Sequence, residues 1–220
     1  MTQHPMPDER RPANRGPKAA AGNRAALVAA AREIYAVHGL DAPLSGIARR
    51  AGVGQGVLYR HFPDRDAIAS AVLEENVRQV EQAAADEGVT FAGVLGVVTW
   101  HLAQSAAFIG LLHADGANGR LRAHASAQDL SERFERALRG CLPDGHRLGA
   151  PESQEAREAP DASDAADAPA AADPSEDLML AVAMVSGAVT GPTPEDRERR
   201  ALAAWRLLGI TVGPVAPFKG

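Results

Sequence analysis

Apolar residues recur every three or four positions over much of this chain, which is the spacing of one face of an α-helix. The first such segment is expected to begin at about Asn23, a good N-cap, and to stop at His38 and Gly39, with Leu27 and Ile34 facing inward. Nowhere does the chain sustain the alternation of β-branched and aromatic residues that is typical of strands, and aromatic residues make up only 4% of it. The pattern therefore predicts an all-α fold.

The segment from Leu44 to Phe62 has the pattern of two short helices joined by a tight turn. Ile47 and Ala51 would lie on one side of the first helix, and the small Ala48 would allow a second helix to cross closely. Gly52 can take the positive φ that the turn requires. Together these features predict a helix-turn-helix unit.

The second helix of this unit is expected from Gln55 to His61, with Gln55, Gly56, Tyr59 and Arg60 pointing outward. Gln55 can make a bidentate contact to adenine, and Gly56 permits a close approach to a base edge. The start of this helix is therefore predicted to read bases in a DNA groove.

A unit ending in AGVGQGVLYRHFPDRDAI resembles the DNA-binding domain of the tetracycline-repressor (TetR) family of bacterial regulators. The resemblance covers roughly Asn23 to Val72 and rests on IARRAGV, on GVLY and on the pair HF before a short turn. It implies a homodimer that binds double-stranded operator DNA, with the Tyr59 hydroxyl on a backbone phosphate. The expected DNA contacts are Gln55, Gly56, Val57, Tyr59, Arg60, His61, Arg65, Pro43 and Ser45.

The chain departs from the family pattern at four positions of this unit. Pro43 stands where the family often has Thr, Gly54 where it often has Ser, and Val57 where it often has Thr or Ser. These exchanges remove three small hydroxyl groups from the expected DNA contacts. Arg65 replaces the usual Lys and keeps its positive charge, so a phosphate contact is still expected there.

Further helices are expected at about 64–87, 88–112, 118–142, 175–190 and 194–209, with Asp64 capping the first of them. The stretch 88–112 contains no Asp, Glu, Lys or Arg, so a membrane span has to be considered. Its polar residues, such as Thr99, and the lack of a basic flank favour instead a helix buried inside a bundle. The resemblance implies that the last two helices pair with their copies in a four-helix dimer interface.

Composition divides the chain further. Residues 1–22, rich in Pro, Gly and Arg, are expected to form a flexible basic arm that either contacts DNA or is a solvated tail. A helix-turn-helix domain at 23–66 and a helical ligand-binding and dimerisation domain at 67–220 follow. Within the latter, residues 143–174 are rich in Ala, Asp, Glu and Pro and are expected to be a disordered acidic linker.

Charge is distributed unevenly about a formal total of -5. Residues 1–65 carry a net charge of +5 and the remainder -10. This division is typical of a basic DNA-binding domain joined to an acidic domain that the DNA phosphates repel. The single cysteine, Cys141, cannot form an intramolecular disulfide, and the N-terminus lacks the apolar core of a secretion signal. A cytoplasmic location is expected.

An enzyme would need a nucleophile with a base, paired acids or metal ligands, and none is spaced convincingly here. The histidines His101, His113 and His124 are far apart in sequence, and no Cys or carboxylate completes a metal-ligand motif. We expect no catalysis, no metal and no cofactor. The alternative is a helical protein-binding module, or a small-molecule-binding enzyme, without a role on DNA.

The resemblance implies a small-molecule pocket in the C-terminal domain. The candidate lining residues are Phe91, Trp100, His101, Gln104, Phe108, Phe134 and Met184. Large apolar walls with few polar groups predict a mostly apolar effector. Its binding is expected to release a repressor from DNA.

Overall fold

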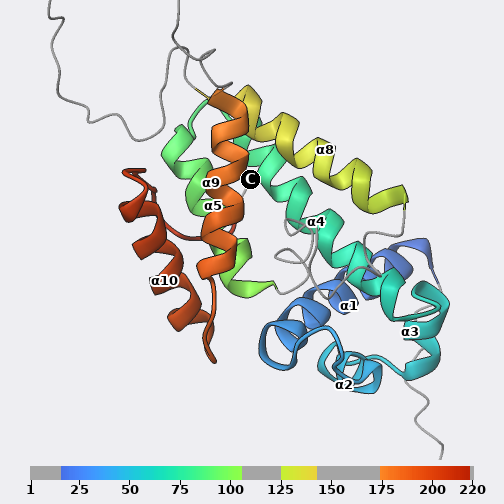
Figure 1. The fold of residues 1–220 in the computed structure, drawn as a ribbon. Helices are drawn as coiled ribbons and strands as arrows, with labels where there is room; N and C mark the ends of the chain where they lie inside the picture. The colour runs from blue at the N-terminus through green and yellow to red at the C-terminus, as the bar shows by residue number, and fades with distance from the viewer. Residues whose placement is uncertain (1–15, 106–124, 143–173, 219–220) are drawn as a thin grey trace, which may run out of the picture.

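The structure is a computed structural model, and it describes residues 16–105, 125–142 and 174–218. These residues contain helices and no strand, so the all-α prediction is confirmed (Figure 1). The helices are α1 (Pro17–His38), α2 (Leu44–Arg50), α3 (Gln55–His61), α4 (Arg65–Ala85), α5 (Phe91–Gln104), α8 (Ala125–Gly140), α9 (Pro174–Ala188) and α10 (Pro194–Leu207). The acidic segment expected at 143–174 lies outside the described residues except for Pro174, the first residue of α9.

Two regions are joined by one long helix. The helices α1, α2 and α3 gather at one end, here called the head, and α4 runs from the head into the remaining helices, here called the body (Figure 1). In the body α8 packs along α4, and α10 packs against both α5 and α9. The helix α1 touches α4 and α5 as well as α2 and α3, so it is the part of the head nearest the body.

The first helix begins at Pro17 rather than at Asn23, so the predicted boundary is wrong. Proline suits the first position of a helix because its missing N–H would have no partner there. Alanines at 19–21 then favour the helix. Lys18 of the expected arm therefore lies in the first turn of α1, whereas residues 1–15 are outside the described part. At the other end Gly39 stops the helix as predicted, with φ +71° and its N–H on the Tyr35 carbonyl oxygen.

Side-chain caps start the longer helices. Asp64 caps α4 as predicted, because its carboxylate accepts a hydrogen bond from the Ala67 N–H at 2.8 Å. Thr90 caps α5 through the Gly93 N–H at 3.2 Å, and Thr193 caps α10. Each cap satisfies a backbone donor that the first helical turn leaves without a partner, which contributes about 1 kcal/mol.

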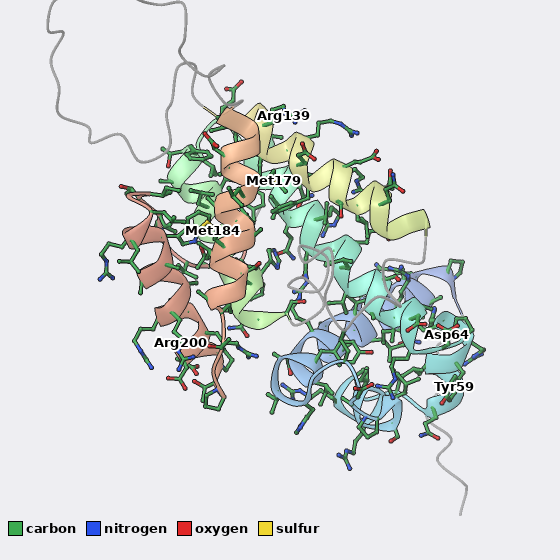
Figure 2. All side chains as sticks on the ribbon, in the orientation of Figure 1. Tyr59, Asp64, Arg139, Met179, Met184 and Arg200 are labelled. Atoms are coloured by element: carbon green, nitrogen blue, oxygen red, sulfur yellow. The ribbon has the colours of Figure 1, made fainter. Side chains whose placement is uncertain are left out.

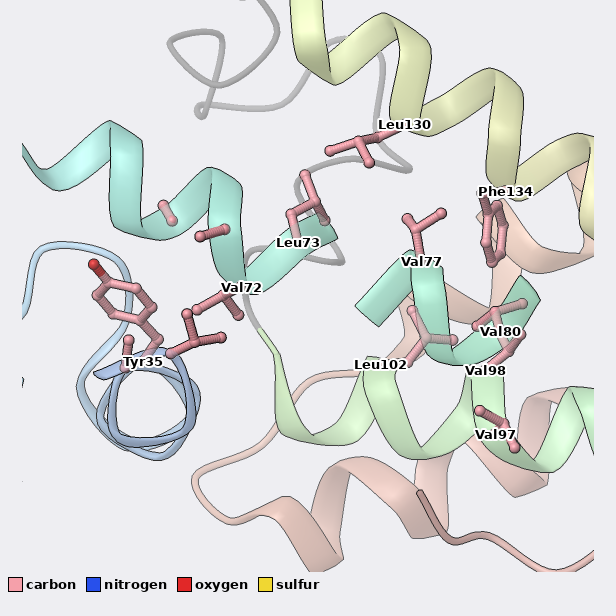
Figure 3. Packing of buried hydrophobic residues seen from close by; sticks show 14 of the residues in the cluster. Tyr35, Val72, Leu73, Val77, Val80, Val97, Val98, Leu102, Leu130 and Phe134 are labelled. Carbon is pink, nitrogen blue, oxygen red and sulfur yellow. The ribbon is translucent and has the colours of Figure 1, made fainter. Parts of the chain in front are cut away.

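One continuous apolar core runs from the head into the body along α4. Figure 3 shows Val72 near Tyr35 of α1, and Val77 and Val80 near Phe134 of α8. Burying each such side chain contributes roughly 1.5 to 3 kcal/mol, so α4 is held from both sides. The head and the body are therefore not separated by a flexible linker along α4.

A buried polar contact joins α10 to α5. The Trp205 indole, completely buried, donates from Nε1 to the Thr99 hydroxyl at 2.9 Å. That hydroxyl donates in turn to the Leu95 carbonyl oxygen at 2.7 Å. The contact satisfies the indole N–H, which would otherwise cost about 1 to 3 kcal/mol to bury.

After α10 the chain crosses α5 without regular secondary structure. The Gly213 N–H donates to the Ala92 carbonyl oxygen at 2.7 Å. A Cβ atom at Gly96 would collide with the Pro214 carbonyl oxygen, so the backbones meet only because Gly96 has no side chain. The sequence pattern did not predict this crossing.

None of the helices in the described ranges combines the length and the apolar character that crossing a bilayer requires. Of the uncharged stretch considered above, residues 91–104 form α5, which packs among other helices, and residues 106–112 lie outside the described part.

Candidate nucleic-acid interface

The turn after α2 has a geometry that fixes the direction of α3. Gly52 has φ +70°, a conformation that residues with a Cβ atom adopt only with strain. The Gly52 N–H donates to the Arg49 carbonyl oxygen at 3.2 Å, and the Val53 N–H to that of Ala48 at 3.0 Å. These two bonds make a Schellman motif. The predicted role of Gly52 is thus confirmed, and α3 begins at Gln55 as expected.

Apolar contacts hold the two short helices against α1. Ile47 of α2 and Leu58 of α3 are completely buried, and Ala48 is 2% exposed. Because Ala48 has only a methyl group, α2 and α3 can approach closely. The opposite side of α3 is therefore held in a fixed orientation toward solvent.

The outward face of α3 carries the residues that the sequence predicts for base and phosphate contacts. Gln55, Gly56, Tyr59 and Arg60 are all exposed, and the Tyr59 side chain is 52% exposed. Figure 2 shows Tyr59 at the α3 end of the molecule, far from Met184 of α9. Of the remaining expected contacts on α3, Val57 and His61 are half-buried.

A groove of about 790 Å³ lies beside this face, between the end of α1, α2 and the start of α3. Pro43, Ser45 and Gln55 line it, together with Arg49. The structure thus brings Pro43 and Ser45, at the start of α2, to the same side of the head as the start of α3.

Arg65 makes contacts that the sequence analysis did not predict. Its Nη1 donates to the carbonyl oxygens of Leu40 at 2.5 Å and Ala42 at 2.6 Å. The side chain is half-buried and fastens the loop between α1 and α2. A phosphate contact by Arg65 stays a prediction, and the structure shows a positioning role within the head.

The expected pocket residues fall into different environments. His101 is completely buried, and burial, helped by the positive charge of Arg32, lowers its pKa to about 3. Phe134 is completely buried and lies beside Val80 in the core (Figure 3). Phe91, Trp100 and Gln104 are half-buried along α5. Phe108 lies outside the described residues.

Met184 is 54% exposed on the outer side of α9, which does not fit the expected place in a pocket. Leu180, one turn earlier, is 60% exposed, and Leu207 of α10 is 89% exposed. The reason is that α9 is apolar nearly all round, so the sequence does not show which side faces inward. In contrast to Met184, Trp205 of α10 is completely buried and is hydrogen-bonded within its own body.

The fold and this face define a class, namely all-helical proteins with an N-terminal helix-turn-helix domain. Residues 27–72 match the family model described as bacterial regulatory proteins, tetR family. The resemblance that the sequence shows to the tetR family of bacterial regulatory proteins is therefore confirmed for the matched residues, which span most of the head and the start of α4.

Individual relatives are more distant. The A-factor receptor protein of Streptomyces griseus is 37% identical over 78 residues, which cover 31% of this chain and 28% of that protein. The match therefore spans less than a third of the relative's length. A TetR transcriptional regulator from Streptomyces coelicolor has a similar fold, with a TM-score of 0.53 and 20% identity over 88% of this chain and 99% of that one. A gamma-butyrolactone receptor gives a TM-score of 0.47 at 20% identity over 86% of this chain and 87% of that one.

Proposed function

We propose that this protein is a sequence-specific DNA-binding transcriptional regulator, a homodimeric repressor that a small, mostly apolar effector releases from its operator. The observation that carries the proposal is the outward face of α3, fixed by the Schellman turn at Gly52 and exposing Gln55, Tyr59 and Arg60. The match of residues 27–72 to the model of the tetR family of bacterial regulatory proteins supports it.

On this proposal α3 enters the major groove of duplex DNA. Gln55 and Gly56 read base edges, while Tyr59 and Arg60 contact backbone phosphates. The contact surface is completed by five further residues, Pro43, Ser45, Val57, His61 and Arg65. Two heads in one dimer would meet successive major grooves about 34 to 36 Å apart.

The dimer surface is proposed on α9 and α10. Leu180, Met184 and Leu207 are large apolar side chains exposed on these two helices. Covering each of them contributes roughly 1.5 to 3 kcal/mol, which favours pairing with a second copy. A completely buried Trp205 gives α10 a firm attachment to its own body, so the pairing surface is held in place.

Effector response is proposed as a shift in population between two arrangements of the heads. The half-buried aromatic residues Phe91 and Trp100 and the buried His101 lie on α5, the helix that α10 packs against. A molecule that moves α5 would move α10 with it and change the spacing of the heads. The name of the Streptomyces griseus relative, a receptor, is in keeping with such a response.

The test is selection of bound duplexes from genomic fragments, followed by fluorescence anisotropy of one selected duplex at several salt concentrations. Binding should weaken steeply with salt, as counterion release requires. Gln55→Ala should relax the preference at one symmetric pair of operator positions by about 1 to 3 kcal/mol.

Arg60→Gln should weaken binding to all sequences alike, because a phosphate contact carries no base preference. Its matched control is Arg139→Gln on α8, an exposed arginine paired with Glu135 and remote from α3. Equal loss in both variants, or no duplex binding by the wild-type protein, would contradict the proposal and favour a helical protein-binding module.

A further inference from the structure

A second groove, of about 540 Å³, lies between α1 and α4 where the head meets the body. The residues that line it come from these two helices. Val28, Ala29 and Ala71 give it an apolar floor. Its charged lining residues are Arg24, Arg32, Arg78, Glu74 and Glu75. The groove thus holds three positive and two negative groups, one positive charge in excess.

The three arginines have different surroundings. Arg78 donates to both carboxylate oxygens of Glu75, at 2.6 and 2.9 Å. Gln79 also donates to Glu75, at 2.9 Å, so this carboxylate receives three hydrogen bonds. Arg24 lies over the ring of Phe62, 5.4 Å from its centroid. Of the two arginines in this groove that form no ion pair within the described residues, Arg32 is the one whose guanidinium nitrogens Nε and Nη2 are buried without a hydrogen-bond partner.

Arg32 has no hydrogen-bond acceptor for its Nε and Nη2 groups, and both nitrogens are buried. Its guanidinium lies over the ring of Trp100 on α5, 5.6 Å from the centroid, which compensates only part of the lost hydration. Burial accordingly lowers the pKa of Arg32, although Glu75 opposes this change. A buried guanidinium without an acceptor is unfavourable unless an anion supplies one.

We propose that the α1–α4 groove is a binding site for a small carboxylate, held by Arg32, with the apolar part of the ligand on the floor formed by Val28, Ala29 and Ala71. The planar guanidinium matches a carboxylate in a bidentate pair. One carboxylate also balances the single excess charge. The volume falls within the range of small-molecule sites, roughly 300 to 1,000 Å³.

A small ligand fits this place better than a nucleic acid phosphate. Arg32 lies over Trp100 of the body rather than on the exposed face of α3, where the DNA contacts are expected. The groove is also formed without α2 or α3, the helices of the candidate DNA-binding face. Because α1 belongs to the head and Trp100 to the body, a ligand on Arg32 would change how the two are held together; this consequence alone rests on the proposed function.

The experiment titrates the DNA-free protein with octanoate and, as a matched uncharged probe, with 1-octanol. Binding is followed by calorimetry and by tryptophan fluorescence, to which Trp100 beneath Arg32 and the buried Trp205 both contribute. Octanoate should bind saturably and at least about tenfold more tightly than octanol, the equivalent of about 1.4 kcal/mol for one charge-assisted contact. Equal affinities would overturn the proposal, as would the absence of saturable octanoate binding.

Three variants sharpen the result. Arg32→Gln should lower octanoate affinity at least about tenfold and leave octanol affinity unchanged. Arg136→Gln, an exposed arginine on α8 outside this groove, should bind octanoate as the wild type does. Arg32→Lys keeps the charge but loses the bidentate fork, so its octanoate affinity should lie between those of Arg32→Gln and the wild type. If Arg32→Gln fails to fold, the octanoate affinity of Arg32→Lys tests the role of Arg32. Octanoate binding that is unaffected by Arg32→Gln or Arg32→Lys would assign the ligand to another site.

A final arm measures anisotropy of the selected duplex with and without octanoate. A change in duplex affinity that is lost in Arg32→Gln supports coupling between this site and the head. If the proposed function fails, no duplex binds while octanoate binding persists. If the carboxylate site is absent, the duplex binds and octanoate does not.

Discussion

The guanidinium of Arg197 on α10 donates from Nη2 to the carbonyl oxygen of Ala36 on α1, 2.7 Å away. Ala36 lies in the last turn of α1, where backbone carbonyls lack partners within the helix and a positive charge is favourable. This hydrogen bond joins the proposed dimer helix directly to the head, across 161 residues of sequence.

Arg197→Gln should therefore destabilise the fold and weaken operator binding. The charge-assisted bond is half-buried, so we expect a loss of about 1 to 2 kcal/mol in the free energy of unfolding. Urea denaturation measures this loss, and anisotropy measures the effect on DNA. Arg206→Gln, exposed on the same helix, is the control and should change neither quantity. Equal stability and equal DNA affinity in the two variants would contradict a role for the Arg197–Ala36 hydrogen bond in joining α10 to the head.

Met184→Lys should prevent dimerisation without unfolding the chain. The side chain is 54% exposed in the single chain, so the charge remains hydrated there, but in a dimer interface it would be buried without a partner at a cost of several kcal/mol. Sedimentation velocity at micromolar concentration should show a dimer for the wild type and a monomer for the variant. Val37→Lys, a 66% exposed site on α1, is the matched control and should remain a dimer. A monomeric wild-type protein would refute the proposed interface.

Tyr35→Phe should raise stability. The Tyr35 hydroxyl is buried and has no hydrogen-bond partner, and burial raises the pKa of this side chain to about 12. Removing the hydroxyl removes its desolvation cost, about 1 to 3 kcal/mol, and leaves the ring in the core. The midpoint of thermal unfolding should rise accordingly. A lower midpoint would mean that the hydroxyl contributes an interaction worth more than its burial costs.

Acid should destabilise the protein through His101. Its pKa is lowered to about 3 in the fold, below the value of about 6.5 expected for an unfolded chain, because burial disfavours the charged ring. The folded state therefore binds fewer protons, so the stabilisation is present above about pH 6.5 and is lost as pH falls toward 3, by up to about 1.4 kcal/mol per pH unit.

Urea denaturation at pH 7 and pH 5 measures this dependence. His101→Gln should reduce the difference between the two values, because the variant has no titrating ring at this position. His38→Gln, which removes an exposed histidine, should leave it nearly unchanged. A wild-type protein equally stable at both pH values would contradict the assignment to His101.

Local patterns predicted the head well. Gly52, the span of α3 and the Asp64 cap follow from residues within a few positions of one another, where backbone geometry and capping chemistry decide the structure. The start of α1 was misplaced because Pro17 permits a helix start that the apolar period does not mark.

Long-range relationships were not predictable in the same way. The bonds of Arg65 to the loop before α2 and of Arg197 to α1 join positions whose pairing depends on tertiary structure. The outward side of α9 could not be identified, because a helix that is apolar all round has no preferred face in its sequence. The resemblance places Met184 in a pocket, whereas this side chain is 54% exposed in the structure.

The buried hydrogen bond between Trp205 and Thr99 couples α10 to α5, so the two helices are expected to move together. The head contacts the body through α4 along the core, through α5 beside α1, and through Arg197 at the end of α1. If α5 shifts, α10 and the contact at Arg197 shift with it, whereas α4 is also held by its packing on α8. A displacement of the contact at Arg197, with the contact to α4 retained, would turn the head rather than translate it. The motion expected of the head is therefore a rotation about α4, in which a small movement near the pivot becomes a larger one at the tip of α3.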